Sequence, residues 1–515
     1  MPEHIYSKTD LINRFDAILG KTLEEIDNKG IFARVQEFNL QKGVAGSLIE
    51  QCVLDYNPDS KQEADLVVVD GERQVKTELK STGMVLESNP KKHFVAKEPM
   101  SITAVGVYDI AEQEFWTSHF WNKLEHMLLV YYLYAADHPV TPYEYRLFPI
   151  KGYEFHEFNE AETEALKQDW EYVRALAARV VSHHPGPKNK EWKAAVKQEY
   201  IDVHGELRRV LSYIDLAPKF PPRFRLKKPI VSSLIAKHFG YQLEQLPGRY
   251  TVITDIDKKC RELTNLYGGK TIGQLASYFG LPCGENKSIC EKIAVAMFGG
   301  KSKKLNQIEL FSRFGLIGKS ITMTPAGGRT EDMKLFHIDF NEMVRTEVVE
   351  DERARPIQFE DSELYAYFAD HEFLCIVYEE PPKEYIINER TGKREETKHP
   401  LGMNKFVGFK RLVFSDEFID TTVRKLWDDI RDKVMNGTLE DVPIMCGGEV
   451  KVLSSGVISS APNFMKSSEN TVFVRGSGSD AAHKTECVNG IRMLAQYVWI
   501  KGSAVIDELK NTPEL

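Results

Sequence analysis

The stretch SKQEADLVVVDGERQVKTELK, from Ser60 to Lys80, predicts a β-hairpin and anchors the interpretation of the fold. Its first part, DLVVV, is rich in β-branched residues, DGERQ has turn composition, and VKTELK alternates polar and apolar residues. In the second strand Glu78 and Lys80 therefore project from one face, together with Lys76. The hairpin can bring Asp65 beside them.

Acidic and basic side chains brought together in this way indicate a particular chemistry. Two carboxylates can hold a hard divalent cation, and a neighbouring lysine can orient or activate an attacking water. These groups are the minimum for metal-assisted hydrolysis of a phosphodiester. Glu-x-Lys also occurs elsewhere, for example at Glu191 and Glu449, so the alternative for the triplet alone is a solvated strand face.

The length and composition set further limits. A chain of 515 residues is too long for one hydrophobic core and predicts two or three domains. No run of about 18 apolar residues suggests a membrane span, and MPEHIYSKTDL has no signal-peptide core. The 7 cysteines are scattered without a CxxC pair, which favours reduced thiols in the cytoplasm and argues against a zinc site.

The overall charge does not by itself indicate a partner. The net charge of −9 is unusual for a protein that binds nucleic acid, although an acidic chain can carry a basic face. In the segment 219–228, KFPPRFRLKK, every charged residue is basic. It is either a solvated strand flanked by lysines or an edge that contacts phosphates.

Around the hairpin the sequence predicts helices and one buried strand. Residues 9–55 have helical periodicity, with a capping box formed by Thr22 and Glu25, and the last of these helices carries Glu50. The apolar segment 127–135, MLLVYYLYA, predicts a buried strand, and residues 158–181 predict an amphipathic helix.

An ordered internal repeat divides the chain. GGKTIGQLA at 268–276 repeats GKTLEEI at 20–26, and NKSICEKIAVAMFG at 286–299 parallels 41–54. Similarity in a constant order predicts a duplicated fold. We therefore expect two tandem domains, at residues 1–245 and 250–515.

The two copies differ at the residues that would carry the chemistry. Val295 stands opposite Glu50 and Ile317 opposite Glu78, while Lys319 keeps the lysine of Lys80. At the place of Asp65 the second copy has Leu310, with Glu309 beside it. A copy without these carboxylates cannot hold a metal in the same way, so we expect the second domain to be non-catalytic.

Seven phrases, in constant order over residues 20–239, carry a resemblance to a known family: GKTLEEI, KGVAGSLIE, SKQEAD, TELKS, TSHFWNKL, QDWE and LKKPIVSSLIAKHF. The first half resembles MutH, the GATC-specific nicking endonuclease of mismatch repair. The whole chain resembles type II restriction endonucleases built from two MutH-like copies, which cut at GATC. The resemblance implies a mixed α/β fold of the restriction-endonuclease class, with a mixed sheet flanked by helices.

The resemblance also implies a catalytic set of residues, namely Glu50, Asp65, Glu78, Lys80 and Lys123. Of these, Asp65 and Glu78, with Glu50, would bind Mg²⁺. Without the resemblance Lys123 is equally well explained as a surface helix residue. Twelve residues separate Asp65 from Glu78, about twice the usual gap in the family, so we expect a longer hairpin and keep Asp70 as an alternative.

The substrate implied by the resemblance is duplex DNA, at one or two copies of the site, with a dimer on DNA as one arrangement. The matching DNA-contact residues are Arg223, Arg225, Lys227 and Lys228, although PPRFR is one residue shorter than the family pattern. The charged segment 379–402 is either an arm around DNA or a hairpin without function.

Three functions compete. The first is a restriction endonuclease that hydrolyses duplex DNA with Mg²⁺ and leaves 5′-phosphates. The second is a repair nickase of the MutH type, and the third is a catalytically silent DNA-binding regulator.

Overall fold

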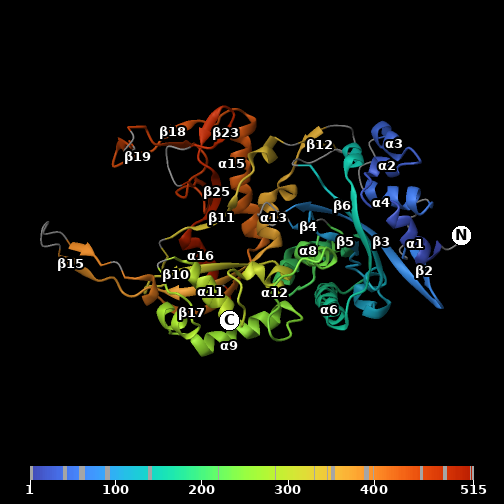
Figure 1. Ribbon diagram of the computed structural model, residues 1–515, viewed down its shortest axis with the longest axis horizontal. Coiled ribbons are helices and arrows are strands. Elements are labelled where there is room, and N and C mark those ends of the chain that lie inside the picture. Colours follow the sequence, from blue (N-terminus) through green and yellow to red (C-terminus); the bar gives the residue numbers. More distant parts are fainter. Residues whose placement is uncertain are drawn as a thin grey trace.

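A computed structural model describes the chain over residues 4–38, 43–56, 64–86, 93–136, 142–217, 220–284, 286–329, 331–344, 346–348, 354–387, 394–397, 399–452, 456–478, 484–510 and 512. The first half of the chain, blue to green, and the second half, yellow to red, lie side by side (Figure 1). In these ranges no helix combines the length and the apolar character needed to cross a membrane.

A mixed sheet forms the centre of the first half. Its main strands are ordered β1-β2-β3-β6-β7, and β4 pairs with the far end of β3. The β1–β2 and β3–β6 pairs are parallel and the others antiparallel, as expected for a mixed α/β fold. The strands are β1 (Ile5–Ser7), β2 (Leu66–Asp70), β3 (Arg73–Leu86), β4 (Phe94–Ala96), β6 (Met127–Leu133) and β7 (Ile150–His156).

Both faces of this sheet are covered, so β6 is buried almost throughout, which confirms the buried strand predicted at 127–135. Leu128 and Val130 contact the apolar sides of the N-terminal helices, whereas Leu129 and Tyr131 belong to the core on the opposite face. The N-terminal helices are α1 (Lys8–Asp16), α2 (Leu23–Ile26), α3 (Ile31–Phe38) and α4 (Val44–Leu48), and the opposite core includes α6 (Glu160–Ser182) and α8 (Lys228–His238).

The hairpin predicted from the opening stretch is present. Strands β2 and β3 pair from Leu66 opposite Thr77 to Asp70 opposite Arg73. Gly71, in the turn, has a φ of +62°, a conformation that glycine adopts without steric cost. These extra paired residues account for the long gap between Asp65 and Glu78.

Local signals in the sequence also set the helix boundaries. Thr22 and Glu25 form the predicted capping box at the start of α2. The helix predicted at 158–181 is α6, which begins after the Asn159 cap. One detail differs from prediction: the helix that carries Glu50 changes from α to a single π-type turn over Ile49–Val53.

The second half contains a sheet with the order and strand senses of β3-β6-β7. In it, β10 (Leu316–Met323) is parallel to β14 (Glu372–Glu379), which is antiparallel to β17 (Lys405–Leu412). The register of strand pairing also agrees between the two sheets. Ile317 lies opposite Phe373 in the second half, as Glu78 lies opposite Met127 in the first.

A smaller antiparallel sheet also occurs in each half. In the first half β9 (Arg223–Leu226) lies between β5 (Met100–Ala104) and β8 (Ile214–Leu216) and leads into α8. In the second, β25 (Gln496–Ile500) lies between β11 (Met333–His337) and β22 (Val472–Gly476) and leads into α16 (Gly502–Lys510).

The halves differ just before the strand that would carry the catalytic triplet. The short helix α12 (Glu309–Arg313) precedes β10 where the hairpin strand β2 precedes β3. The other main helices of the second half are α9 (Ile253–Tyr267), α10 (Ile272–Tyr278), α11 (Ser288–Met297), α13 (Glu363–Asp370) and α15 (Arg424–Met435).

The halves are joined by a shared core and by buried charge. One apolar cluster contains Leu129 and Tyr131 of the first half together with Leu374 and Phe409 of the second. At the junction, Arg411 donates to Asp257 and Glu372 within the second half and to the carbonyl oxygen of Arg209 in the first half.

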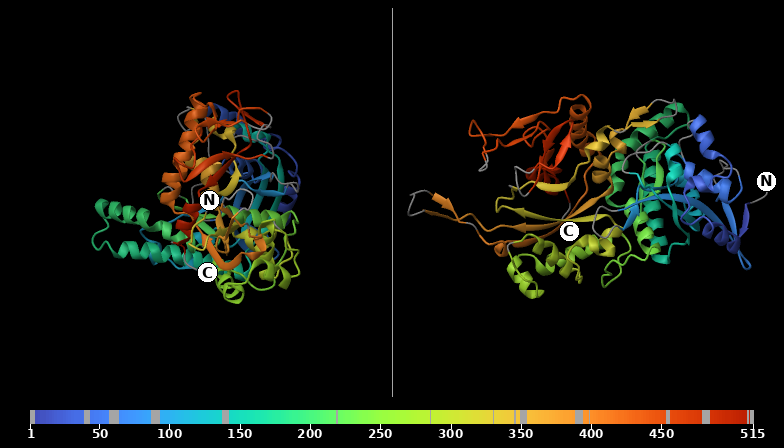
Figure 2. Two further views of the ribbon diagram at one scale, coloured as in Figure 1. Left: turned by 90° about the vertical axis from the view of Figure 1, so that its left-hand side faces the viewer. Right: turned by 45° about the horizontal axis from the view of Figure 1, so that its top comes forward.

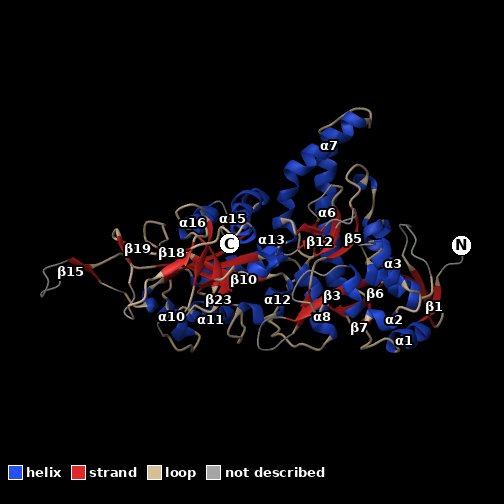
Figure 3. Ribbon diagram, turned by 90° about the horizontal axis from the view of Figure 1, so that it is seen from above, coloured by secondary structure: helices blue, strands red, loops and turns tan. Residues whose placement is uncertain are grey.

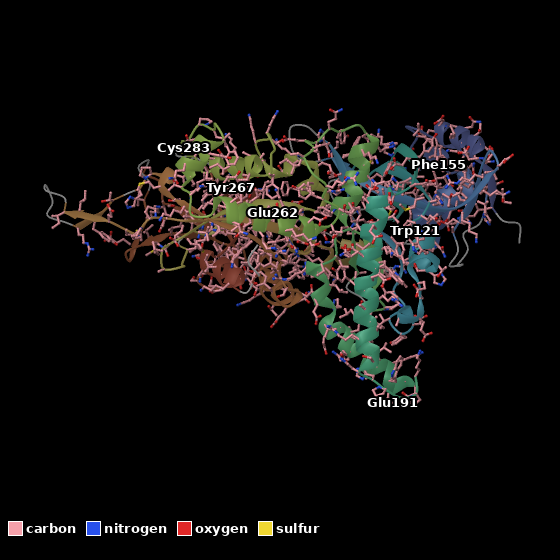
Figure 4. All side chains as sticks on the ribbon, turned by 90° about the horizontal axis from the view of Figure 1, so that it is seen from below. Trp121, Phe155, Glu191, Glu262, Tyr267 and Cys283 are labelled. Atoms are coloured by element: carbon pink, nitrogen blue, oxygen red, sulfur yellow. The ribbon has the colours of Figure 1, made fainter. Side chains whose placement is uncertain are left out.

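Two hairpins project from this body. One is helical and consists of α6 and α7 (Lys190–Val203), with Glu191 at its far end (Figures 3 and 4). The other carries β15 (Tyr385–Ile387) and β16 (Arg394–Glu396) and extends from the second half (Figure 2).

Candidate active site

The hairpin register brings two of the candidate carboxylates together. Leu66 lies opposite Thr77, so the next pair outward is Asp65 and Glu78. The Leu79 N–H donates to Asp65 Oδ2 at 2.9 Å, which fixes the aspartate against β3. Asp70, by contrast, lies at the hairpin tip and pairs with Lys8 at 2.6 Å. The geometry therefore groups Asp65, not Asp70, with Glu78.

Glu78 is buried, unlike a residue on a solvated strand face. Its side chain is only 2% exposed and is held by two ammonium groups. Lys80 Nζ lies 2.8 Å from Oε1, and Lys123 Nζ lies 2.8 Å from Oε1 and 2.9 Å from Oε2. The two ammonium groups compensate the water that burial removes from this carboxylate.

Lys123 reaches the site from outside the hairpin. It is the C-terminal cap of α5 (His119–Asn122), whose first turn is capped by the Ser118 hydroxyl. Its side chain is 12% exposed. The alternative of a surface helix residue does not describe this position, and the neighbouring Trp121 lies among the first-half helices and strands in Figure 4.

Glu50 approaches from the π-type turn that ends the N-terminal helices. Such turns recur at functional sites because they redirect one side chain without ending the helix. The chain then folds back, with the Tyr56 N–H donating to the Glu50 carbonyl oxygen at 3.0 Å. Burial raises the pKa of Tyr56, and the charges of Glu50, Asp65 and Glu78 raise it further, which indicates that the phenol lies near these carboxylates.

The electrostatics of this cluster favour a bound cation. Burial, and then the Glu78 carboxylate, raise the pKa of Asp65, while the Leu79 N–H and the two lysines act in the opposite direction. A raised pKa means that the second negative charge is costly at this point. A cation between the carboxylates would remove that cost.

The donors suit Mg²⁺ better than a metal that needs a complete protein cage. Among the described residues, no three aspartate, glutamate, histidine or cysteine side chains converge as a closed metal site does. Mg²⁺ in phosphate chemistry is commonly held by one or two carboxylates, with water and phosphate oxygens as the remaining ligands. Asp65 and Glu78 fit that pattern, with Glu50 nearby.

The corresponding positions of the second half have a different character. Val295 is buried in α11, and Ile317 on β10 lies at the position that corresponds to Glu78. Lys319 donates to the Lys334 carbonyl oxygen at 3.0 Å, and burial lowers the pKa of its amine to about 8. Glu309 pairs with Arg313 on α12 at 3.3 Å.

The predicted DNA-contact residues divide into two groups. Arg223 is exposed on β9 and donates from Nε to Ser101 Oγ at 3.0 Å. Arg225 is engaged by Asp215 through two contacts, of 2.7 and 3.0 Å.

Lys227 and Lys228 face the junction between the halves. Lys227 donates to the Leu211 carbonyl oxygen at 2.6 Å and lies 3.6 Å from Glu372. Both lysines and Arg225 line a cavity of about 360 Å³ whose other wall comes from the second half. Their charge is therefore largely met within the protein, and DNA contact by this set stays a prediction.

The sequence did not indicate Tyr56, a residue that lies near the candidate carboxylates. Its hydroxyl is buried without a hydrogen-bond partner among the described residues. A tyrosine in a loop after a helix carries no motif, so only the three-dimensional arrangement reveals it.

Comparison with known proteins places this geometry in context. Residues 54–169, from Leu54 to Asp169, match the family described as DNA mismatch repair enzyme MutH. That segment includes Asp65, Glu78, Lys80 and Lys123. The chain is also 23% identical over 461 residues to the type II restriction enzyme Sau3AI of Staphylococcus aureus, covering 86% of this chain and 83% of that protein. These matches confirm that the chain is similar to the MutH-like type II restriction endonucleases, as its sequence phrases indicated.

Proposed function

We propose that the chain is a restriction endonuclease that hydrolyses phosphodiester bonds of duplex DNA at GATC, with Mg²⁺, and leaves 5′-phosphates. The single observation that supports this most is the meeting of Asp65 and Glu78 with Lys80 and Lys123. Glu78 is buried and held by lysines from two elements, and Asp65 is fixed beside it by the Leu79 N–H, so this arrangement is not a surface salt bridge.

In this proposal Asp65 and Glu78 hold the metal ion, and Glu50 holds it or one of its waters. Bound there, Mg²⁺ would supply positive charge at the scissile phosphate and at the leaving 3′ oxygen. Lys80 orients the attacking water and helps to remove its proton. Lys123 fixes the Glu78 carboxylate through both oxygens, so that the ligand keeps one orientation.

We further propose that the chain is a tandem duplication, with a catalytic domain at 1–245 and a non-catalytic domain at 250–515. The matched order of β3-β6-β7 and β10-β14-β17 supports this division. The second domain lacks the carboxylates and would act as an effector that binds a second copy of the site, either within one molecule or in a dimer on DNA.

For contact with DNA, Arg223 is the best placed of the predicted basic residues, because it is exposed. A guanidinium can read guanine through two hydrogen bonds in the major groove. Arg225, Lys227 and Lys228 would reach phosphates only if the junction between the halves opens. A DNA substrate, together with the 7 cysteines that are all free thiols, supports a cytoplasmic location.

The test is incubation of the purified protein with unmethylated plasmid, with Mg²⁺ or with EDTA, followed by mapping of fragment ends. The proposal predicts discrete double-strand cuts at GATC that require Mg²⁺. Nicked circles alone would instead favour a repair nickase, which the MutH match also accommodates. Binding without any cleavage would favour the silent regulator.

A further inference from the structure

The hydroxyl of Tyr56 is an unexplained polar group near the candidate site. Its oxygen is inaccessible to solvent and has no hydrogen-bond partner among the described residues. Leaving a buried hydroxyl unpaired costs about 1–3 kcal/mol. Native proteins rarely retain such a group unless it has a role, for example toward a ligand.

The backbone places Tyr56 beside Glu50, whose carbonyl oxygen accepts the Tyr56 N–H at 3.0 Å. The preceding residue, Asp55, has a φ of +61°, in the left-handed region that residues other than glycine seldom adopt. Lys29 Nζ holds its carboxylate at 2.5 Å, and Tyr6 donates to the Leu54 carbonyl oxygen at 2.5 Å. Backbone strain that neighbouring contacts maintain in this way clusters at functional sites.

Side-chain contacts then fix the ring. The His4 ring meets the Tyr56 ring edge-on at 4.0 Å between centroids, which limits rotation of the phenol. The electrostatic neighbours of the phenol, besides Tyr6, are Glu50, Asp65 and Glu78. The hydroxyl of a phenol can donate a hydrogen bond, for example to a water bound by a metal ion.

We propose that Tyr56 is a positioning residue, whose hydroxyl donates a hydrogen bond to a water in the coordination shell of the divalent cation held by Asp65 and Glu78. The inference rests on the proposed function. It adds a residue that orients a metal-bound water to the carboxylates that bind the metal and the lysine that acts on the nucleophile. Partners of metal ligands of this kind typically change affinity or activity by about 10- to 100-fold.

The test compares Tyr56→Phe with the wild type and with Tyr153→Phe. Phenylalanine keeps the ring and its contact with His4, and removes only the unpaired hydroxyl. Tyr153 is a matched control, because its hydroxyl donates to Asp16 at 2.7 Å on the α1 side of the same half. Mn²⁺ binding would be measured by titration calorimetry, and melting temperature would be recorded in EDTA and in Mn²⁺.

The proposal predicts that Tyr56→Phe weakens Mn²⁺ binding by about 10- to 100-fold. The metal-induced rise in melting temperature should shrink accordingly, while the melting temperature in EDTA should not fall. Tyr153→Phe should bind Mn²⁺ like the wild type.

Two results would overturn the assignment. One is Mn²⁺ affinity of Tyr56→Phe equal to that of the wild type. The other is a clearly lower melting temperature of Tyr56→Phe in EDTA, which would make the hydroxyl a structural group. If the wild type itself bound no Mn²⁺, the proposed function would fail as well, so the two failures are distinguishable.

Discussion

Lys80 and Lys123 contact the same buried carboxylate, yet replacing each by methionine should have opposite consequences for stability and for catalysis. Lys123 makes two contacts with Glu78, at 2.8 and 2.9 Å, from a side chain that is 12% exposed. Lys80 makes one contact, at 2.8 Å, and is 20% exposed. Methionine keeps the aliphatic stem of each lysine and removes its charge.

The expected magnitudes follow from these contacts. Lys123→Met removes two of the three lysine contacts of the buried Glu78 and leaves it with Lys80 alone, so it should lower the free energy of unfolding by about 2–4 kcal/mol. Lys80→Met should cost about 1–2 kcal/mol, because it removes one contact from a more exposed group. Cleavage should show the reverse order. Lys80→Met, which removes the lysine that acts on water, should reduce the cleavage rate about 10²- to 10⁴-fold. Lys123→Met, which removes only contacts that hold Glu78, should reduce the rate about tenfold.

The assay pairs urea unfolding in EDTA with single-turnover cleavage of a duplex oligonucleotide at saturating protein and Mg²⁺. Lys8→Met is the control. It removes the exposed ion pair with Asp70 and should cost less than about 1 kcal/mol without changing the rate. The division of roles between the two lysines would be refuted if Lys80→Met were less stable than Lys123→Met and cleaved DNA at a near-normal rate.

Three further predictions concern the scaffold. Asp169 is buried and accepts backbone N–H groups on the segment before β8, so Asp169→Ala should lower the free energy of urea unfolding by about 3–5 kcal/mol; a loss below about 1 kcal/mol would contradict this. Burial lowers the pKa of His371 from 6.5 to about 4. The neutral form of His371 therefore contributes its full stability above pH 6.5, and about 3 kcal/mol of this should be lost as the pH falls toward 4. The urea midpoint should fall with pH over this range, and His371→Gln should reduce that dependence. Arg411→Leu should cost about 3–5 kcal/mol in the same assay, because the buried Asp257 would lose both contacts with the guanidinium and Glu372 would keep only the more distant Lys227, at 3.6 Å. Wild-type stability of this variant would contradict the prediction.

Features encoded by neighbouring residues could be predicted from the sequence. The capping box of Thr22 and Glu25 depends on residues three apart, and the β6 strand depends on one continuous apolar run. The hairpin pairing of Asp65 with Glu78 was also accessible, because the intervening turn and the alternation of β3 fix which side chains meet.

Features that depend on contacts between distant segments could not be predicted in the same way. The reach of Lys123 to Glu78 spans 45 residues, and only family resemblance suggested it. Nothing local distinguishes an exposed Arg223 from an Arg225 neutralised by Asp215, because both lie on the same face of one strand. In the second half the α12 helix occupies the place that β2 has in the first half, although the alignment of the two copies set Leu310 opposite Asp65.

The central claim is that Asp65, together with Glu78, holds the metal ion used to cut DNA. The most direct measurement is the single-turnover rate of duplex cleavage by Asp65→Asn, with Asp70→Asn as its matched control. Asp65→Asn should be at least about 10³-fold slower than the wild type at all Mg²⁺ concentrations, while Asp70→Asn should cut normally. Normal cleavage by Asp65→Asn, or inactivity confined to Asp70→Asn, would contradict the account.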